Sequence, residues 1–136
     1  MSKPNEEPAD SPGADNPFKG KTGLTRLWNA LGYSRAGLVA AYRNEDAFRQ
    51  EVLMAAVMIP AAFFVTTSGI GRAMMIGSVL LVMIVELLNS AIEATVDRIS
   101  VEHHHLAKRA KDIGSAAVLL ALINLAAIWL LVIFGR

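Results

Sequence analysis

The chain has 136 residues, of which 54% are hydrophobic and 18% are charged. Average soluble domains have about 45–50% apolar and about 25% charged residues, and a compact domain of this length buries only about two-thirds of its unfolded surface. The composition therefore indicates a membrane protein. The net charge of +1 excludes nucleic-acid binding driven by long-range electrostatics, and the lack of cysteine excludes disulfides, a thiol nucleophile and a thiolate zinc site.

Residues 1–23 hold four of the five prolines together with acidic, glycine and serine residues. The segment has too few apolar side chains to offset the entropy of ordering it, so it is expected to be a disordered cytoplasmic tail. Residues 24–43 then show apolar side chains at helical spacing, with arginines between them. This pattern predicts one or two amphipathic helices on a membrane surface, with Gly32-Tyr33-Ser34 as an interruption.

Three apolar stretches follow, at residues 52–65, 73–96 and 113–134. The second and third reach the length of about 20 residues that a helix needs to cross a bilayer. The first is shorter, but the polar residues 66–68 are tolerated in lipid and so is Pro60 within a helix. We therefore predict an all-α integral membrane domain over residues 24–136, with spans at about 48–68, about 73–97 and about 113–134.

Basic residues predict how these spans are oriented. Arg35, Arg43 and Arg49 precede the first span, and four basic residues fill the connection between the second and the third, whereas the connection between the first and the second has only Arg72. Basic residues concentrate on the cytoplasmic side of a membrane. The N-terminus is therefore expected to be cytoplasmic and the C-terminus to lie outside.

The second predicted span carries a stripe of polar residues. At about 100° per residue, Glu86, Asn89, Ser90, Glu93 and Asp97 project within one sector of roughly 100°. A charged residue at the bilayer centre costs at least about 2.5–3.5 kcal/mol, so such residues indicate function, although hydrogen bonds that hold an oligomer together are an alternative. Glu93 lies near the water boundary, where a carboxylate can hold Mg²⁺, and Glu86 lies about 10 Å deeper, where it can take a proton from a buried hydroxyl.

Two polar segments lie next to the spans on the predicted inner side. Residues 44–51 (NEDAFRQE) can supply a second magnesium carboxylate, or can be a solvated helix start with a Glu45–Arg49 pair. Residues 102–112 contain three consecutive histidines, but neighbouring side chains on a helix point apart and the ligand set for zinc is incomplete. The basic residues of this segment either only set the orientation or provide Lys111 as a phosphate contact.

Three motifs together resemble one known family. NEDAFRQE at 44–51, ELLNSAIEATVDR at 86–98 and RAKDIGSA at 109–116, in this order among three spans, strongly resemble the prokaryotic diacylglycerol kinases, a family of small integral membrane kinases. The resemblance covers about residues 24–135. It implies transfer of the γ-phosphoryl group of ATP to the hydroxyl of sn-1,2-diacylglycerol in the bacterial inner membrane, by a homotrimeric helix bundle whose sites join helices of neighbouring subunits.

The resemblance also implies roles for single residues. Glu86 would be the general base that acts on the lipid hydroxyl, Asn89 would help to position it, and Glu45 and Glu93 would hold Mg²⁺ at the ATP phosphates. The residues expected near ATP are Arg26, Tyr33, Glu45, Glu93, Glu102, His103, His104, Lys111 and Asp112. Those expected near the lipid are Arg26, Ser34, Arg49, Gln50, Glu51, Glu86 and Ser115.

Two other functions stay open on the sequence alone. An undecaprenol kinase of the same fold would share the spans and the carboxylates, and the RAKDIGSA run favours the diacylglycerol enzymes over it. A small proton-coupled transporter would use Glu86 as the exchanging acid, but it would not account for the grouping of Glu45, Glu93 and Lys111 on one side of the membrane.

Overall fold

The computed structural model describes residues 23–99 and 104–135. This part of the chain forms four helices, α1 (Leu24–Asn44), α2 (Asp46–Val65), α3 (Gly69–Ile99) and α4 (His105–Phe134), and it contains no strand. The all-α class that the sequence predicts is therefore confirmed. The predicted disordered tail lies outside the described residues, except for Gly23. The chain divides into two compact units at residues 36 and 37, and every interhelical contact discussed below lies within the second unit.

Helix α1 begins after Gly23, whose positive φ of 65° is a backbone conformation that glycine adopts without steric cost. The helix runs without interruption through Gly32, Tyr33 and Ser34 to Asn44, so the segment is one helix. Its large apolar side chains are exposed, among them Leu24 and Trp28. Such a surface suits contact with lipid, as expected for an interfacial helix.

Helices α2, α3 and α4 are each long and apolar enough to cross a membrane. Helix α3 has 31 residues, which at 1.5 Å each is about 46 Å and exceeds a hydrocarbon core of about 30 Å. Pro60 lies inside α2 without ending it, whereas Thr66, at the end of this helix, has an extended backbone. Many large side chains of these helices are exposed, such as Phe64 of α2 and Leu131 of α4, which suits a surface covered by lipid or by partner chains.

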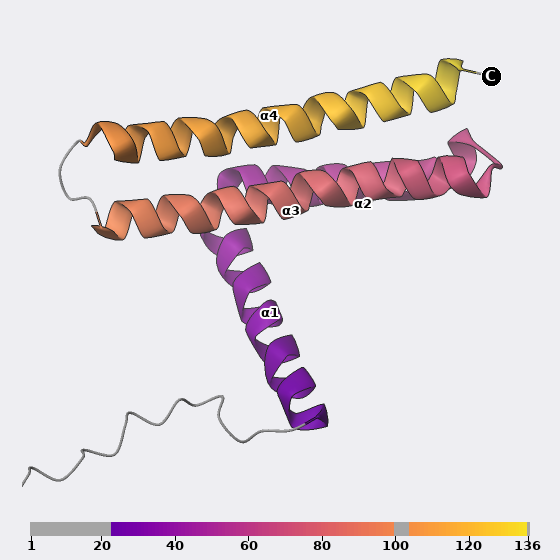
Figure 1. The fold of residues 1–136 in the computed structure, drawn as a ribbon. Helices are drawn as coiled ribbons and strands as arrows, with labels where there is room; N and C mark the ends of the chain where they lie inside the picture. Colours follow the sequence, from indigo (N-terminus) through magenta and orange to yellow (C-terminus); the bar gives the residue numbers. More distant parts are fainter. Residues whose placement is uncertain (1–22, 100–103, 136) are drawn as a thin grey trace, which may run out of the picture. The chain divides into compact units, whose positions relative to one another are not determined.

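Helix α3 is central among the three, because it packs against both α2 and α4 (Figure 1). Their shared core joins one residue of α2, two of α3 and two of α4: Ala55, Val79, Val82, Ala121 and Leu125. Trp129 of α4 adds an interhelical hydrogen bond, from Nε1 to the carbonyl of Met75 at 3.4 Å. A polar residue on the core-facing side of α3 is therefore enclosed by its neighbours.

Side chains fix both ends of α2. At its start, the Arg49 guanidinium donates to the carbonyl oxygens of Tyr42 and Arg43, each at 3.1 Å, which lie in the last turn of α1. At its end, Ser68 Oγ accepts from the backbone N–H of Gly71 at 3.2 Å, and Arg72 Nε donates to the carbonyl of Thr66 at 2.9 Å. The two turns therefore set where α2 begins and ends beside α3.

Candidate active site

The polar stripe of α3 changes from buried to exposed along the helix. Glu86 is 5% exposed and Asn89 is 9% exposed. Ser90 and Glu93 are half-buried, and Asp97 is exposed close to the end of the helix. The stripe therefore begins inside the helix bundle and ends at its surface, which gives the carboxyl groups of Glu86 and Glu93 different surroundings.

Asn89 has its two polar atoms in different surroundings. Its Nδ2 donates to Oε1 of Glu93 at 3.2 Å, one turn further along α3. Its Oδ1 is buried and has no hydrogen-bond partner among the described residues. Because buried polar atoms are normally hydrogen-bonded, an orphaned acceptor beside two acidic residues indicates a place where a bound molecule or water donates.

A second buried carboxyl group comes from α2. Glu51 is 8% exposed, and its Oε2 also lacks a hydrogen-bond partner within the described part of the chain. It lies within electrostatic range of Glu86, which in turn lies within range of Glu45 and Glu93. The N-cap and second turn of α2 and the second half of α3 thus bring four carboxyl groups within electrostatic range of one another's neighbours, with Glu86 common to them.

Helix α4 brings a cation to the same region. Nζ of Lys111 lies 2.5 Å from Oδ1 of Asp97, which joins the start of α4 to the end of α3, and Glu93 is within electrostatic range of the same ammonium. Asp112, next in sequence, is exposed and pairs with Lys108 at 2.6 Å. Of the two residues expected to bind nucleotide here, Lys111 therefore lies beside the carboxylates, and Asp112 pairs within its own helix.

The donor set suits a hard cation only in part. Within residues 23–99 and 104–135, no three Asp, Glu or His side chains are grouped as a metal site. Mg²⁺ commonly takes one or two protein carboxylates and completes its shell with water and substrate phosphates. Glu45 and Glu93, both within range of Glu86, fit the protein's share of such a shell.

Five further residues were expected near ATP, of which the structure describes Arg26, Tyr33 and His104. Arg26 and Tyr33 lie on α1 within the first unit, where both are exposed. Glu102 and His103 lie outside the described residues. His104 forms the N-cap of α4, where its Nδ1 accepts from the backbone N–H of Leu106 at 3.2 Å.

The remaining residues expected near the lipid differ in their surroundings. Ser34 is exposed on α1, and Gln50 and Ser115 are exposed on α2 and α4. Arg49 is partly buried, and its guanidinium binds the end of α1 and forms an ion pair with Asp46. Glu86 and Glu51 are the two members of this group that are buried in the bundle.

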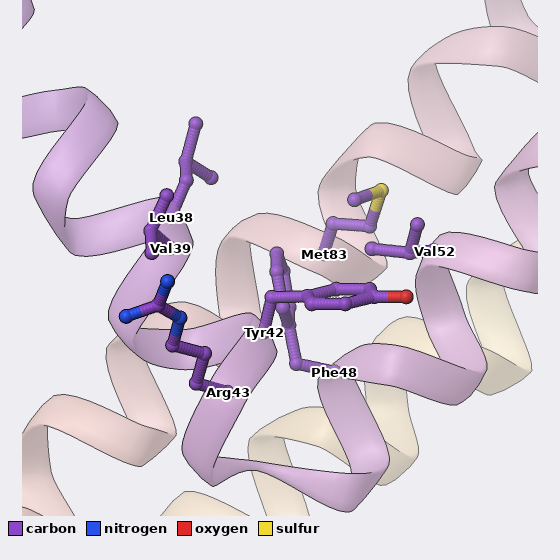
Figure 2. A pocket seen from close by; sticks show the side chains of 7 residues that line it. All are labelled: Leu38, Val39, Tyr42, Arg43, Phe48, Val52 and Met83. Carbon is purple, nitrogen blue, oxygen red and sulfur yellow. The ribbon is translucent and has the colours of Figure 1, made fainter.

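An apolar pocket of about 320 Å³ lies where the end of α1 meets α2 and α3 (Figure 2). Met83 of α3 lines it and precedes Glu86 by three residues, and Val52 of α2 lines it directly after Glu51. No pattern in the sequence predicted this pocket. The other lining residues are Leu38, Val39, Tyr42, Arg43 and Phe48, and the first three were recognised only as part of an apolar helix face.

Gly114, a buried residue of α4, was also not among the predicted site residues. A Cβ built on it would lie 3.2 Å from Cγ of Asn89 and would collide with Oδ1. Its position inside a predicted helix was a signal that could have identified it. Glycine there destabilises a helix by about 1 kcal/mol relative to alanine, so its presence indicates a packing or functional reason.

Comparison with known proteins agrees with the three motifs. The family model of the prokaryotic diacylglycerol kinases matches residues 32–133. A diacylglycerol kinase of Pseudomonas aeruginosa is 57% identical over 120 residues, which are 88% of this chain and 98% of that protein. A diacylglycerol kinase of Haemophilus influenzae is 52% identical over 79% of this chain and 92% of its own length. One of Escherichia coli is 51% identical over 85% of this chain and 94% of its own length. The resemblance is thereby confirmed: this integral membrane protein belongs to the prokaryotic diacylglycerol kinase family.

Proposed function

We propose that this protein transfers the γ-phosphoryl group of ATP to the hydroxyl of sn-1,2-diacylglycerol and so makes phosphatidic acid. Membership of the family and the names of the relatives support this reaction. The observation that carries the assignment to a site is the buried Glu86, with Asn89 one turn away on one side and Met83, which lines the apolar pocket, one turn away on the other. A lipid alcohol needs this combination, because its chains require apolar surroundings and its hydroxyl requires a base.

In the proposed reaction, the carboxylate of Glu86 takes the proton of the lipid hydroxyl. The hydroxyl oxygen forms a bond to the γ-phosphorus, the bond from that phosphorus to the β–γ bridging oxygen breaks, and ADP leaves. Phosphoryl transfer depends chiefly on positioning and on neutralising charge, so no nucleotide-binding fold is required. Asn89, one turn along α3 from the base, contributes through Nδ2, which donates to Oε1 of Glu93 and holds that carboxylate in place.

The nucleotide end of the proposed site is the region where α2 begins, α3 ends and α4 begins. Glu45 and Glu93 hold Mg²⁺, which when bound supplies charge neutralisation at the ATP phosphates. Lys111 contacts a phosphate as a point charge and exchanges its partner Asp97 for it. By the family's pattern, the other nucleotide contacts are Arg26, Tyr33, Glu102, His103, His104 and Asp112.

The lipid end combines the apolar pocket with the polar residues of α2. The pocket, at about 320 Å³, is large enough for part of an acyl chain but not for a whole diacylglycerol. Glu51 places a second carboxyl group near the base. Arg26, Ser34, Arg49, Gln50 and Ser115 complete the contacts that the family's pattern assigns to the lipid.

We further propose that the protein acts as a homotrimer in the bacterial inner membrane, with a cytoplasmic N-terminus and a periplasmic C-terminus. The family's pattern supports the homotrimer, and exposed small residues of α3 such as Ala91 and Ala94 permit close packing of helices within a bilayer. The concentration of basic residues at the end of the bundle that holds Lys108 and Lys111 supports the orientation. This orientation brings the nucleotide end of the site to the compartment that contains ATP.

The test is transfer of radiolabelled γ-phosphate from Mg·ATP in mixed micelles that contain diacylglycerol or undecaprenol. Label should enter phosphatidic acid, and Glu86→Gln should lower kcat by about 10²–10⁴-fold, as is usual for loss of a general base. Thr95→Ala, at an exposed position of the same helix, is the matched control and should keep full activity.

Three outcomes would count against parts of the proposal. A folded Glu86→Gln variant that keeps more than about a tenth of kcat would exclude Glu86 as the base. Label mainly in the polyprenyl phosphate would show that undecaprenol is the lipid substrate, and the proposed mechanism would stand. No transfer to either lipid by a folded preparation would contradict the kinase activity itself.

A further inference from the structure

Gly114 faces Asn89 across the contact between α3 and α4. Of the helical glycines that the structure describes, Gly114 would suffer the closest side-chain collision if it carried a Cβ, because that atom would overlap Oδ1 of Asn89. Gly77 of α3 is a useful contrast, since a Cβ there would have no atom within 4 Å. The volume that a side chain at residue 114 would fill is thus taken by the amide oxygen of Asn89.

This contact fixes the position of the whole Asn89 amide group. Its oxygen lies against α4 at Gly114, and its nitrogen donates to Oε1 of Glu93 at 3.2 Å. The side chain is 9% exposed and has little room to rotate. A methyl group at residue 114 would push the oxygen away from α4, and the nitrogen would then leave Glu93.

From this geometry we propose that Gly114 is a positioning residue for phosphoryl transfer: its missing side chain leaves room for the Asn89 amide oxygen, so that Nδ2 is held where it donates to the Glu93 carboxylate. The inference rests on the proposed function of Asn89 and Glu93. A glycine that merely allows two helices to pack closely would alter stability alone. The proposed role alters how well the enzyme uses Mg²⁺, because Glu93 is one of its two proposed ligands.

The first measurement compares Gly114→Ala with Gly77→Ala. Both replace a helical glycine by alanine, which helix propensity favours, so the pair isolates the collision with Asn89. Gly114→Ala should lower kcat by about tenfold to a hundredfold, the range expected for a small misplacement of a catalytic group, and should raise the Mg²⁺ concentration at half-maximal rate. The KM for diacylglycerol should change by a smaller factor than kcat or the Mg²⁺ concentration at half-maximal rate. Gly77→Ala should leave all three unchanged.

The second measurement asks whether the effect passes through Asn89. In an Asn89→Ala background the colliding oxygen is gone, so adding Gly114→Ala should change neither kcat nor the Mg²⁺ dependence any further. Thermal unfolding in micelles also tests whether the effect of Gly114→Ala depends on Asn89, and it needs no activity measurement. Gly114→Ala should raise the midpoint by a few degrees in the Asn89→Ala background through helix propensity, but not in the wild-type background.

Each result decides the inference. Equal losses from Gly114→Ala in both backgrounds would overturn it, and so would a Gly114→Ala enzyme that behaves like Gly77→Ala. Should Gly114→Ala alone fail to fold, the Gly114→Ala/Asn89→Ala double variant is expected to fold, and its failure would also overturn the inference.

Other results would contradict the proposed function itself and not the role of Gly114. Full activity of Asn89→Ala and of Glu93→Ala would remove these residues from the reaction whatever Gly114 does. Loss of activity in both, with normal kcat and Mg²⁺ dependence in Gly114→Ala, would leave the proposed function intact and reject only the role of Gly114.

Discussion

At the scale of single residues, the site is defined by polar groups that burial makes costly. Glu86, Asn89 and Glu51 are each less than a tenth exposed, on helices whose other buried side chains are mostly apolar. A buried polar group without a partner costs on the order of 1–3 kcal/mol, so such groups persist where a ligand or a reaction uses them. Glu51 is the least explained of the three, because one of its oxygens is unpartnered among the described residues and the charged group within electrostatic range of it is another acid, Glu86.

We expect Glu51→Gln to be more stable than the wild type. Glutamine keeps the shape of the side chain and removes a buried charge that Glu86 repels, which should raise the midpoint of thermal unfolding by a few degrees. Circular dichroism in micelles would measure the midpoint. Gln50→Ala, at the exposed neighbouring position, serves as the control and should change it little. A lower midpoint for Glu51→Gln would show that the carboxylate has a stabilising partner instead.

The face of a helix on which a residue lies could be predicted from the sequence, because the regular spacing of the helix alone determines it. Glu86, Asn89 and Glu93 share a face because an α-helix repeats every 3.6 residues, and the sequence predicted that stripe. Gly114 and the apolar pocket depend on which faces of α2, α3 and α4 meet, and spacing within one helix does not determine that. The role of Asn89 toward Glu93 was predictable from their separation of four residues, whereas its contact with α4 was not.

At the scale of helices, hydropathy located the long elements but not the details of their ends. The sequence suggested an interruption at Gly32-Tyr33-Ser34, yet α1 continues through it, because one glycine costs about 1 kcal/mol and longer helices tolerate that. The first apolar stretch was extended to about residue 68, whereas α2 ends at Val65. The turn that follows is built by side-chain hydrogen bonds of Ser68 and Arg72, which apolar content does not report.

The junction between α1 and α2 gives a prediction at this scale. Arg49 of α2 donates to two carbonyls in the last turn of α1, a position where a cation also favours the helix dipole. Arg49→Ala should therefore lower the free energy of local opening there by about 0.5–1.5 kcal/mol, which is roughly a twofold to tenfold faster amide exchange. Hydrogen exchange of residues 43–45 would measure it.

Arg35→Ala, elsewhere on α1, is the control for this measurement and should leave exchange at residues 43–45 unchanged. Unchanged exchange in Arg49→Ala as well would mean that these two hydrogen bonds do not hold the junction. An increase spread over all of α2 would instead indicate that Arg49 supports the whole helix and not the turn.

At the scale of the whole molecule, polar side chains lie between the helices and apolar side chains lie on the outer surface, and the bilayer environment accounts for both. Every backbone group of a span must be satisfied inside its own helix, so the chain can place its few polar side chains only where helices face each other or water. The described helices agree with this, because Glu86 and Asn89 face the bundle while large apolar side chains of α2 and α4 face outward. The sequence predicted this arrangement well, since length and hydropathy determine it.

Orientation in the membrane gives the last prediction. The turn at Thr67 and the start of α4 at His105 lie at opposite ends of α3, and the chain contains no cysteine, so single cysteines at these exposed positions report the two sides without background. With the basic end inside, a membrane-impermeant maleimide should label Thr67→Cys in intact spheroplasts, and should label His105→Cys only after lysis. Lysed samples of both variants control for reactivity. Labelling of His105→Cys alone in intact spheroplasts would place the carboxylates and Lys111 on the side without ATP, and the proposed nucleotide site would then be wrong.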